Sequence, residues 1–166
     1  EKGFLYCTDE IKNMILKYNS EDQKVFEWGV EGSAEGQFSK PAGIASDLAG
    51  HLYVVDAGNH RIQKFTSDGH FIHCWGEFGS ERGQFNDPWG ITVDSQGFVY
   101  VADWGNDRVQ KFTGDGEWLQ IFGVSSPDAL RLNHPSDVAV DSEGDVYVAD
   151  WGNKKVQIFD SDGEIL

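Results

Sequence analysis

Three aspartates, each followed five residues later by a basic residue, have the types and spacing that could support acid–base chemistry. A carboxylate beside a guanidinium or ammonium group forms a charge-assisted hydrogen bond, and in active sites the same pairing shifts the pKa values of catalytic groups. Because the pair recurs nearly unchanged three times, we expect a structural staple across a hairpin rather than a catalytic pair. The expected staples are Asp56 with Arg61, Asp103 with Arg108, and Asp150 with Lys155.

Histidines, cysteines and nucleophile motifs add no catalytic or metal-binding pattern to the sequence. The five histidines lack metal-ligand spacing, and Cys7 and Cys74 do not occupy equivalent positions in the repeated pattern described below. The sequence has no Gly-x-Ser-x-Gly motif, phosphate-binding loop or Cys–His arrangement. We therefore expect no catalytic residue, no metal site and no cofactor in these residues, and we predict that the chain is not an enzyme.

Three tryptophans stand at positions where otherwise similar segments of the chain differ. Trp89 follows a proline, whereas Trp104 and Trp151 follow the aspartate of a staple. Exposed tryptophans are frequent anchors in binding sites, and the alternative is that each packs against a neighbouring element. We predict that the three lie on one loop face and bind a protein partner, with a carbohydrate as the alternative ligand. The candidate site residues are Trp89, Trp104, Trp151, Asp87, His134 and Arg108.

These residues belong to a pattern that recurs with a fixed offset of 47 residues. Its best-matched copies are Tyr53–Phe65, Tyr100–Phe112 and Tyr147–Phe159, and such a period is typical of arrays of supersecondary units. In each copy, short apolar and β-branched runs between Gly, Asp and Asn turns predict a meander of four antiparallel strands. The Gly-Asn turn is expected to supply positive φ angles. In the first copy, Asp9–Met14 replaces that turn, which should therefore differ in shape.

Within each copy, Pro-x-Gly-Ile-x-x-Asp and then Gly-x-x-Tyr-Val-x-Asp-x-Gly-Asn-x-Arg-[Ile/Val]-Gln-Lys-Phe resembles the NHL repeat. The resemblance covers nearly the whole chain and implies an all-β propeller with four-stranded blades. We expect a segment of about four blades, incomplete as a single closed ring. Strands two to four of blade 1 should lie in residues 1–32, blade 2 in 33–79, blade 3 in 80–126 and blade 4 in 127–166. Such a segment is either part of a longer chain or completes a ring by self-association, because open blades expose apolar faces.

The resemblance also implies two further functional classes. One is a lyase-type enzyme, amidating-lyase-like or streptogramin-lyase-like, with its active site in blades outside this sequence. Ala42, Trp89 and Ser136 stand where the amidating lyase has its metal-binding histidines. The other class is an RNA-binding module, but the net charge of −15 and the lack of a basic stripe make nucleic acid an unexpected partner. No apolar run is long enough to span a membrane, and the sequence does not indicate a compartment.

Overall fold

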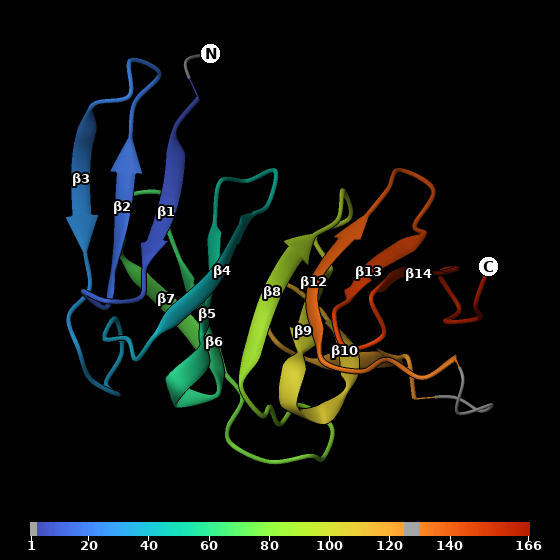
Figure 1. Ribbon diagram of the computed structural model, residues 1–166. Helices are drawn as coiled ribbons and strands as arrows, with labels where there is room; N and C mark the ends of the chain where they lie inside the picture. The colour runs from blue at the N-terminus through green and yellow to red at the C-terminus, as the bar shows by residue number, and fades with distance from the viewer. Residues whose placement is uncertain (1–2, 125–129) are drawn as a thin grey trace.

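The computed structural model describes residues 3–124 and 130–166, which form four antiparallel sheets that stand side by side in chain order (Figure 1). We call each sheet a blade. Blade 1 contains β1 (Leu5–Asp9), β2 (Met14–Tyr18) and β3 (Lys24–Trp28). Blade 2 contains β4 (Pro41–Ser46), β5 (Leu52–Asp56), β6 (Arg61–Phe65) and β7 (Phe71–Trp75). Blade 3 contains β8 (Pro88–Val93), β9 (Val99–Asp103), β10 (Arg108–Phe112) and β11 (Trp118–Phe122). Blade 4 contains β12 (Pro135–Val140), β13 (Val146–Asp150) and β14 (Lys155–Phe159).

Every blade is a meander, in which strands adjacent in sequence are hydrogen-bonded neighbours. No strand in the described part of the chain joins blade 1 to blade 4, so the ring is open. The expected all-β segment of about four propeller blades is therefore confirmed. Within residues 3–124 and 130–166, no helix has the length and apolar character needed to cross a bilayer.

The turns between the second and third strands differ from the expected geometry. In blades 2 and 3 these turns are the short 3-10 segments η1 (Ala57–Asn59) and η2 (Trp104–Asn106). The positive φ lies on the residue after the asparagine, with φ 54° at His60 and 55° at Asp107, rather than on the glycine. Gly58 is required for another reason, since a Cβ atom there would lie 2.8 Å from the carbonyl oxygen of Ser39. The divergent turn of blade 1 also places a left-handed residue at the equivalent position, Asn13.

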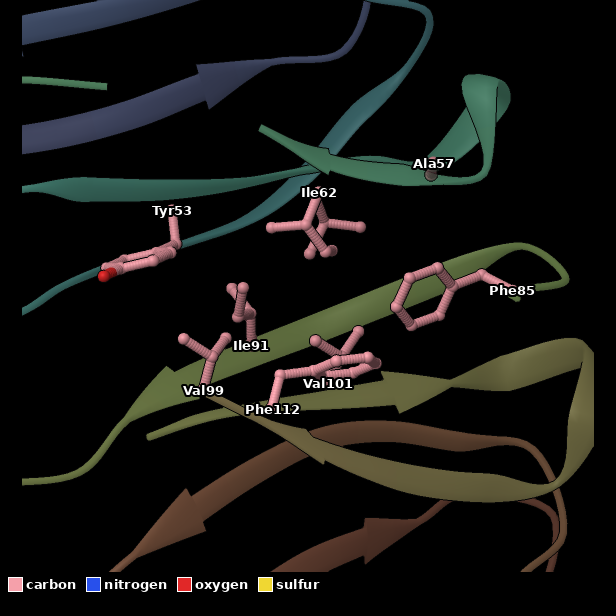
Figure 2. Packing of buried hydrophobic residues seen from close by; sticks show 9 residues of the cluster. Tyr53, Ala57, Ile62, Phe85, Ile91, Val99, Val101 and Phe112 are labelled. Carbon is pink, nitrogen blue, oxygen red and sulfur yellow. The ribbon is translucent and has the colours of Figure 1, made fainter. Parts of the chain in front are cut away.

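Apolar side chains of neighbouring blades form the core (Figure 2). Between blades 2 and 3, Tyr53 and Ile62 pack against Ile91, Val101 and Phe112. Equivalent clusters fill the spaces between blades 1 and 2 and between blades 3 and 4. Each fully buried aliphatic or aromatic side chain contributes about 1.5–3 kcal/mol through removal from water. The contacts between blades therefore hold the array together and fix the positions of its loops.

The first strand of blade 3, β8, contacts the first strands of both neighbouring blades, β4 and β12, and this close approach brings their loops together. Gly90 on β8 permits the approach, because a Cβ atom there would lie 2.6 Å from the Cα atom of Asp137 on β12. The turns η1 and η2 are at the same end of their blades, at the bottom of Figure 1. The connections between blades reach this end as well, since Gly58 and Gly105 donate backbone hydrogen bonds to Ser39 and Asn86. We call this end the loop face.

Candidate functional site

The staple of blade 3 is centred on the fully buried carboxylate of Asp103. This carboxylate accepts four hydrogen bonds, from Asn86 N (2.8 Å), Asn106 Nδ2 (2.9 Å), Arg108 Nε (2.7 Å) and Gln110 Nε2 (3.2 Å). Burial raises the pKa of Asp103, and the hydrogen bonds from Asn86, Asn106 and Arg108 oppose that rise. A carboxylate enclosed by donors in this way holds the connection, the turn and the third strand together. The arrangement is structural rather than that of an exposed acid or base.

Blade 2 repeats this arrangement, and blade 4 repeats it without its basic residue. Asp56 accepts hydrogen bonds from Ser39 N, Asn59, Arg61 and Gln63, and Asp150 accepts them from Asn133 N, Asn153 and Gln157. Lys155 is exposed and makes no ion pair with Asp150 in the described part of the chain, contrary to the expected third staple. A lysine ammonium lacks the planar fork with which arginine reaches a carboxylate and nearby carbonyl groups together.

The same geometry corrects the assignment of Arg108 to the binding site. Arg108 is 6% exposed, and its guanidinium also donates to the carbonyl oxygens of Ser80, Glu81 and Gln84 at 2.7–2.8 Å. A guanidinium satisfied by one carboxylate and three carbonyl groups has little capacity left for a ligand. Arg108 therefore belongs to the staple, and the candidate binding surface consists of the other predicted residues.

The structure brings the three predicted tryptophans into one row across blades 3 and 4. The ring centroids of Trp89 and Trp104 are 5.1 Å apart, and those of Trp104 and Trp151 are 5.2 Å apart. Trp89 and Trp151 are 48% and 64% exposed, whereas Trp104 between them is half-buried. A row of large apolar side chains that remains open to solvent is typical of an interaction surface.

His134 adjoins this row. Its ring centroid is 5.0 Å from that of Trp104, in an edge-to-face arrangement. The His134 backbone N–H donates to Asp107 Oδ1 at 2.7 Å, and the ring atom Nδ1 lies 2.6 Å from Asn133 Oδ1. These contacts fix the position of the imidazole beside the central indole.

Asp87, the remaining predicted residue, lies on the loop face at the start of blade 3. Its side chain is exposed, and its backbone N–H donates to His60 Nδ1 at 3.2 Å. The same link between blades joins Lys40 N to Asn13 Oδ1 at 2.7 Å. The sequence analysis did not predict this hydrogen bond between blades. The sequence does contain its acceptor, because a side chain able to accept a hydrogen bond follows the turn between the second and third strands in each of the first three copies.

A hollow lies beside each end of the row. The hollow at Trp151, of about 440 Å³, is lined by Ser136, Ala149, Lys155 and Val156, among other residues. The hollow at Trp89, of about 210 Å³, includes Glu10, Lys40 and Asp87 in its lining. The row is therefore a ridge between two depressions.

The opposite face of the blades is held by lysines that link successive blades. The ammonium of Lys64 donates to the carbonyl oxygen of Gly114 at 2.8 Å, pairs with Asp115 at 3.1 Å and lies over the ring of Tyr53. Burial lowers the pKa of Lys64, but hydrogen bonds to Asp115 and Tyr53 outweigh it and the pKa is raised. An equivalent contact occurs one repeat earlier at Lys17.

No group of three or more His, Cys, Asp or Glu residues that could hold a metal ion occurs in the described parts of the chain.

Solved structures with a similar fold include a catalytically inactive histidine-to-alanine variant of virginiamycin B lyase from Staphylococcus aureus with quinupristin. It is 20% identical with a TM-score of 0.75, and the match covers 99% of this chain and 51% of that chain. A streptogramin B lyase structure also matches, with 20% identity and a TM-score of 0.75, over 99% of this chain and 50% of that chain. Kuenenia stuttgartiensis hydrazine synthase matches with 16% identity and a TM-score of 0.74, over 98% of this chain and 44% of that chain. The chain thus spans about half the length of these structures. The comparison with curated proteins finds no match.

These similarities correct one sequence-based prediction. The prediction that the chain is not an enzyme is contradicted, because the solved structures that share its fold include virginiamycin B lyase and streptogramin B lyase. At 20% identity the similarity shows the fold alone. In such a fold, a missing catalytic motif is weak evidence against enzymatic activity, because one fold supports many functions through its loops.

The family model described as NHL repeat matches residues 38–65, 85–112 and 132–159. Each match starts at a buried apolar residue in the connection before a blade and ends with that blade's third strand. Together the three matches make up just over half of the chain. This chain therefore belongs to the NHL repeat family.

Proposed function

We propose that the loop face binds a protein partner through Trp89, Trp104 and Trp151. The observation that carries the proposal is the contact of three indole rings in one row, with both outer rings exposed. Tryptophan is enriched among residues that dominate binding energy, because it buries a large area and loses little conformational entropy. The hollow at the Trp89 end of the row adds relief that a flat apolar patch would lack.

The ring geometry favours a protein over a carbohydrate. Stacking of a sugar needs an open, flat indole face, but neighbouring rings in the row are tilted by 43° and 47° and touch one another. Trp104 is enclosed by its two neighbours and by His134. The row therefore forms a continuous apolar ridge rather than a series of separate platforms.

The double substitution Trp89→Ala and Trp151→Ala tests this proposal. Peptides are first selected from a display library for binding to the native chain. Their affinity for the variant should be at least about tenfold lower than for the native chain, equivalent to about 1.4 kcal/mol of binding free energy. Binding is measured by calorimetry, and the unfolding midpoint should change little because both side chains are exposed. Phe78→Ala is the matched control, because Phe78 is 66% exposed and lies outside the row. Unchanged peptide affinity, or unfolding of the double variant, would assign the tryptophans to packing instead.

A lyase-type activity is the second candidate, because the matched virginiamycin B lyase was solved with quinupristin and because His134 contacts the tryptophan row. An imidazole held beside an apolar surface can serve as a general acid or base. Incubation of the native chain with quinupristin, followed by mass spectrometry, should then show conversion that His134→Ala abolishes. If quinupristin remains intact while selected peptides bind, the protein-binding proposal stands and this lyase candidate fails.

A further inference from the structure

The outermost blades expose side chains whose repeat equivalents are buried. Val156 of blade 4 is 63% exposed, whereas Ile62 and Val109 at the same position of blades 2 and 3 are 0% exposed. Leu5 of blade 1 is 58% exposed, whereas Leu52 at the same position of blade 2 is 1% exposed. Both outer faces therefore carry residue types that the internal contacts between blades use as core.

Each contact between adjacent blades has two different sides. We call the side on the blade that comes earlier in the chain the leading side, and the side on the following blade the trailing side. On the leading side, Tyr53 and Ile62 of blade 2 face blade 3, which presents Val99 and Phe112 on its trailing side (Figure 2). Val55 of blade 2 belongs to the same buried cluster. The offset of 47 residues places a leading side on the open face of blade 4 and a trailing side on the open face of blade 1. The leading side of blade 4 is Tyr147, Ala149 and Val156, and the trailing side of blade 1 is Leu5, Cys7 and Tyr18.

We propose that the leading side of blade 4 packs against the trailing side of blade 1 of a second copy of this chain. The contact continues the series already formed between blades 1 and 2, 2 and 3, and 3 and 4, with the same positions on each side. A second copy fits because each chain carries both halves of the contact in the same orientation.

The predicted contact is head-to-tail, because two different faces meet. Its apolar centre resembles the internal contacts, in which the equivalent residues are shielded from water. A charged side chain introduced at either half would be desolvated without a partner and would prevent association. Each half can therefore be disabled separately while the single chain stays folded, since Val156 and Leu5 are exposed within it.

Sedimentation velocity and light scattering on the native chain and on two variants test the proposal. The native chain should show a concentration-dependent mass of about twice 18.5 kDa or a multiple of it. Val156→Asp and Leu5→Asp should each remain at the mass of one chain. An equimolar mixture should recover a species of two chains, because one variant retains the intact leading side and the other retains the intact trailing side.

Leu48→Asp is the control for added charge, because Leu48 is 88% exposed and lies on neither side of the contact. This variant should associate as the native chain does, and circular dichroism should show that all variants retain the native sheet content. The proposal is overturned if the native chain stays at 18.5 kDa at every concentration. It is equally overturned if either aspartate variant still associates, or if mixing the two fails to restore the two-chain species.

Discussion

Replacing Asp103 with alanine is expected to lower the free energy of unfolding by about 3–5 kcal/mol. The carboxylate accepts four hydrogen bonds, one of them from the backbone of Asn86, and it lies 2.7 Å from the Nε atom of Arg108. Its removal leaves the guanidinium, which is 6% exposed, without a counter-charge. An uncompensated buried charge costs more than the loss of an exposed ion pair, which is worth about 0–1 kcal/mol.

Urea denaturation followed by circular dichroism measures this change. Asp162→Ala is the control, because Asp162 is exposed on a turn and its side chain makes no hydrogen bond in the described part of the chain. The control should alter stability by about 0.5 kcal/mol or less. A loss below about 1 kcal/mol for Asp103→Ala would contradict the assignment of this carboxylate as a structural centre.

Replacing Phe112 with alanine is expected to cost about 3–5 kcal/mol through loss of burial and creation of a cavity. Phe112 is 0% exposed and lies between blades 2 and 3 (Figure 2). Its ring centroid is 5.6 Å from that of Phe85 and 5.9 Å from that of Trp75. Because the extensive contacts of each blade in the described residues are with adjacent blades, a weakened contact between two blades should also reduce the cooperativity of unfolding.

Thermal and urea unfolding of Phe112→Ala and Phe78→Ala provide a matched comparison. Phe78 has the same side chain but is 66% exposed, so its truncation creates no buried cavity. We expect about a 3 kcal/mol difference or more between the two variants. Equal stabilities would show that contacts between blades contribute less than their burial indicates.

The staples of blades 2 and 3 could be predicted from the sequence because they are local. Asp56 and Arg61 are directly opposed across one hairpin, and Asp103 and Arg108 repeat that register. Two strands joined by a short turn bring such residues together whatever the rest of the chain does. Blade 4 shows the limit of this reasoning, because its register is the same but Lys155 remains exposed.

Contacts between blades could not be derived in the same way. The bonds from Asp87 N to His60 and from His134 N to Asp107 each span 27 residues and depend on the distance and tilt between sheets. The same is true of the tryptophan row, whose members were predicted to share a face but whose mutual contacts need two adjacent blades. Burial of Arg108 likewise depends on the connection that folds over it.

The sequence by itself determined the unit, because the spacing of turns, aspartates and apolar runs specifies a four-stranded meander through short-range hydrogen bonds and alternating side chains. The 47-residue offset also determined that such units follow one another and which residues occupy equivalent positions. Only the tertiary structure decided which equivalent residues are buried and which are exposed. Ile62 and Val156 hold the same place in their blades, yet one is covered by a neighbouring sheet and the other is open. Burial depends on what packs against a side chain, and the packing of one blade on the next is not contained in the pattern of either.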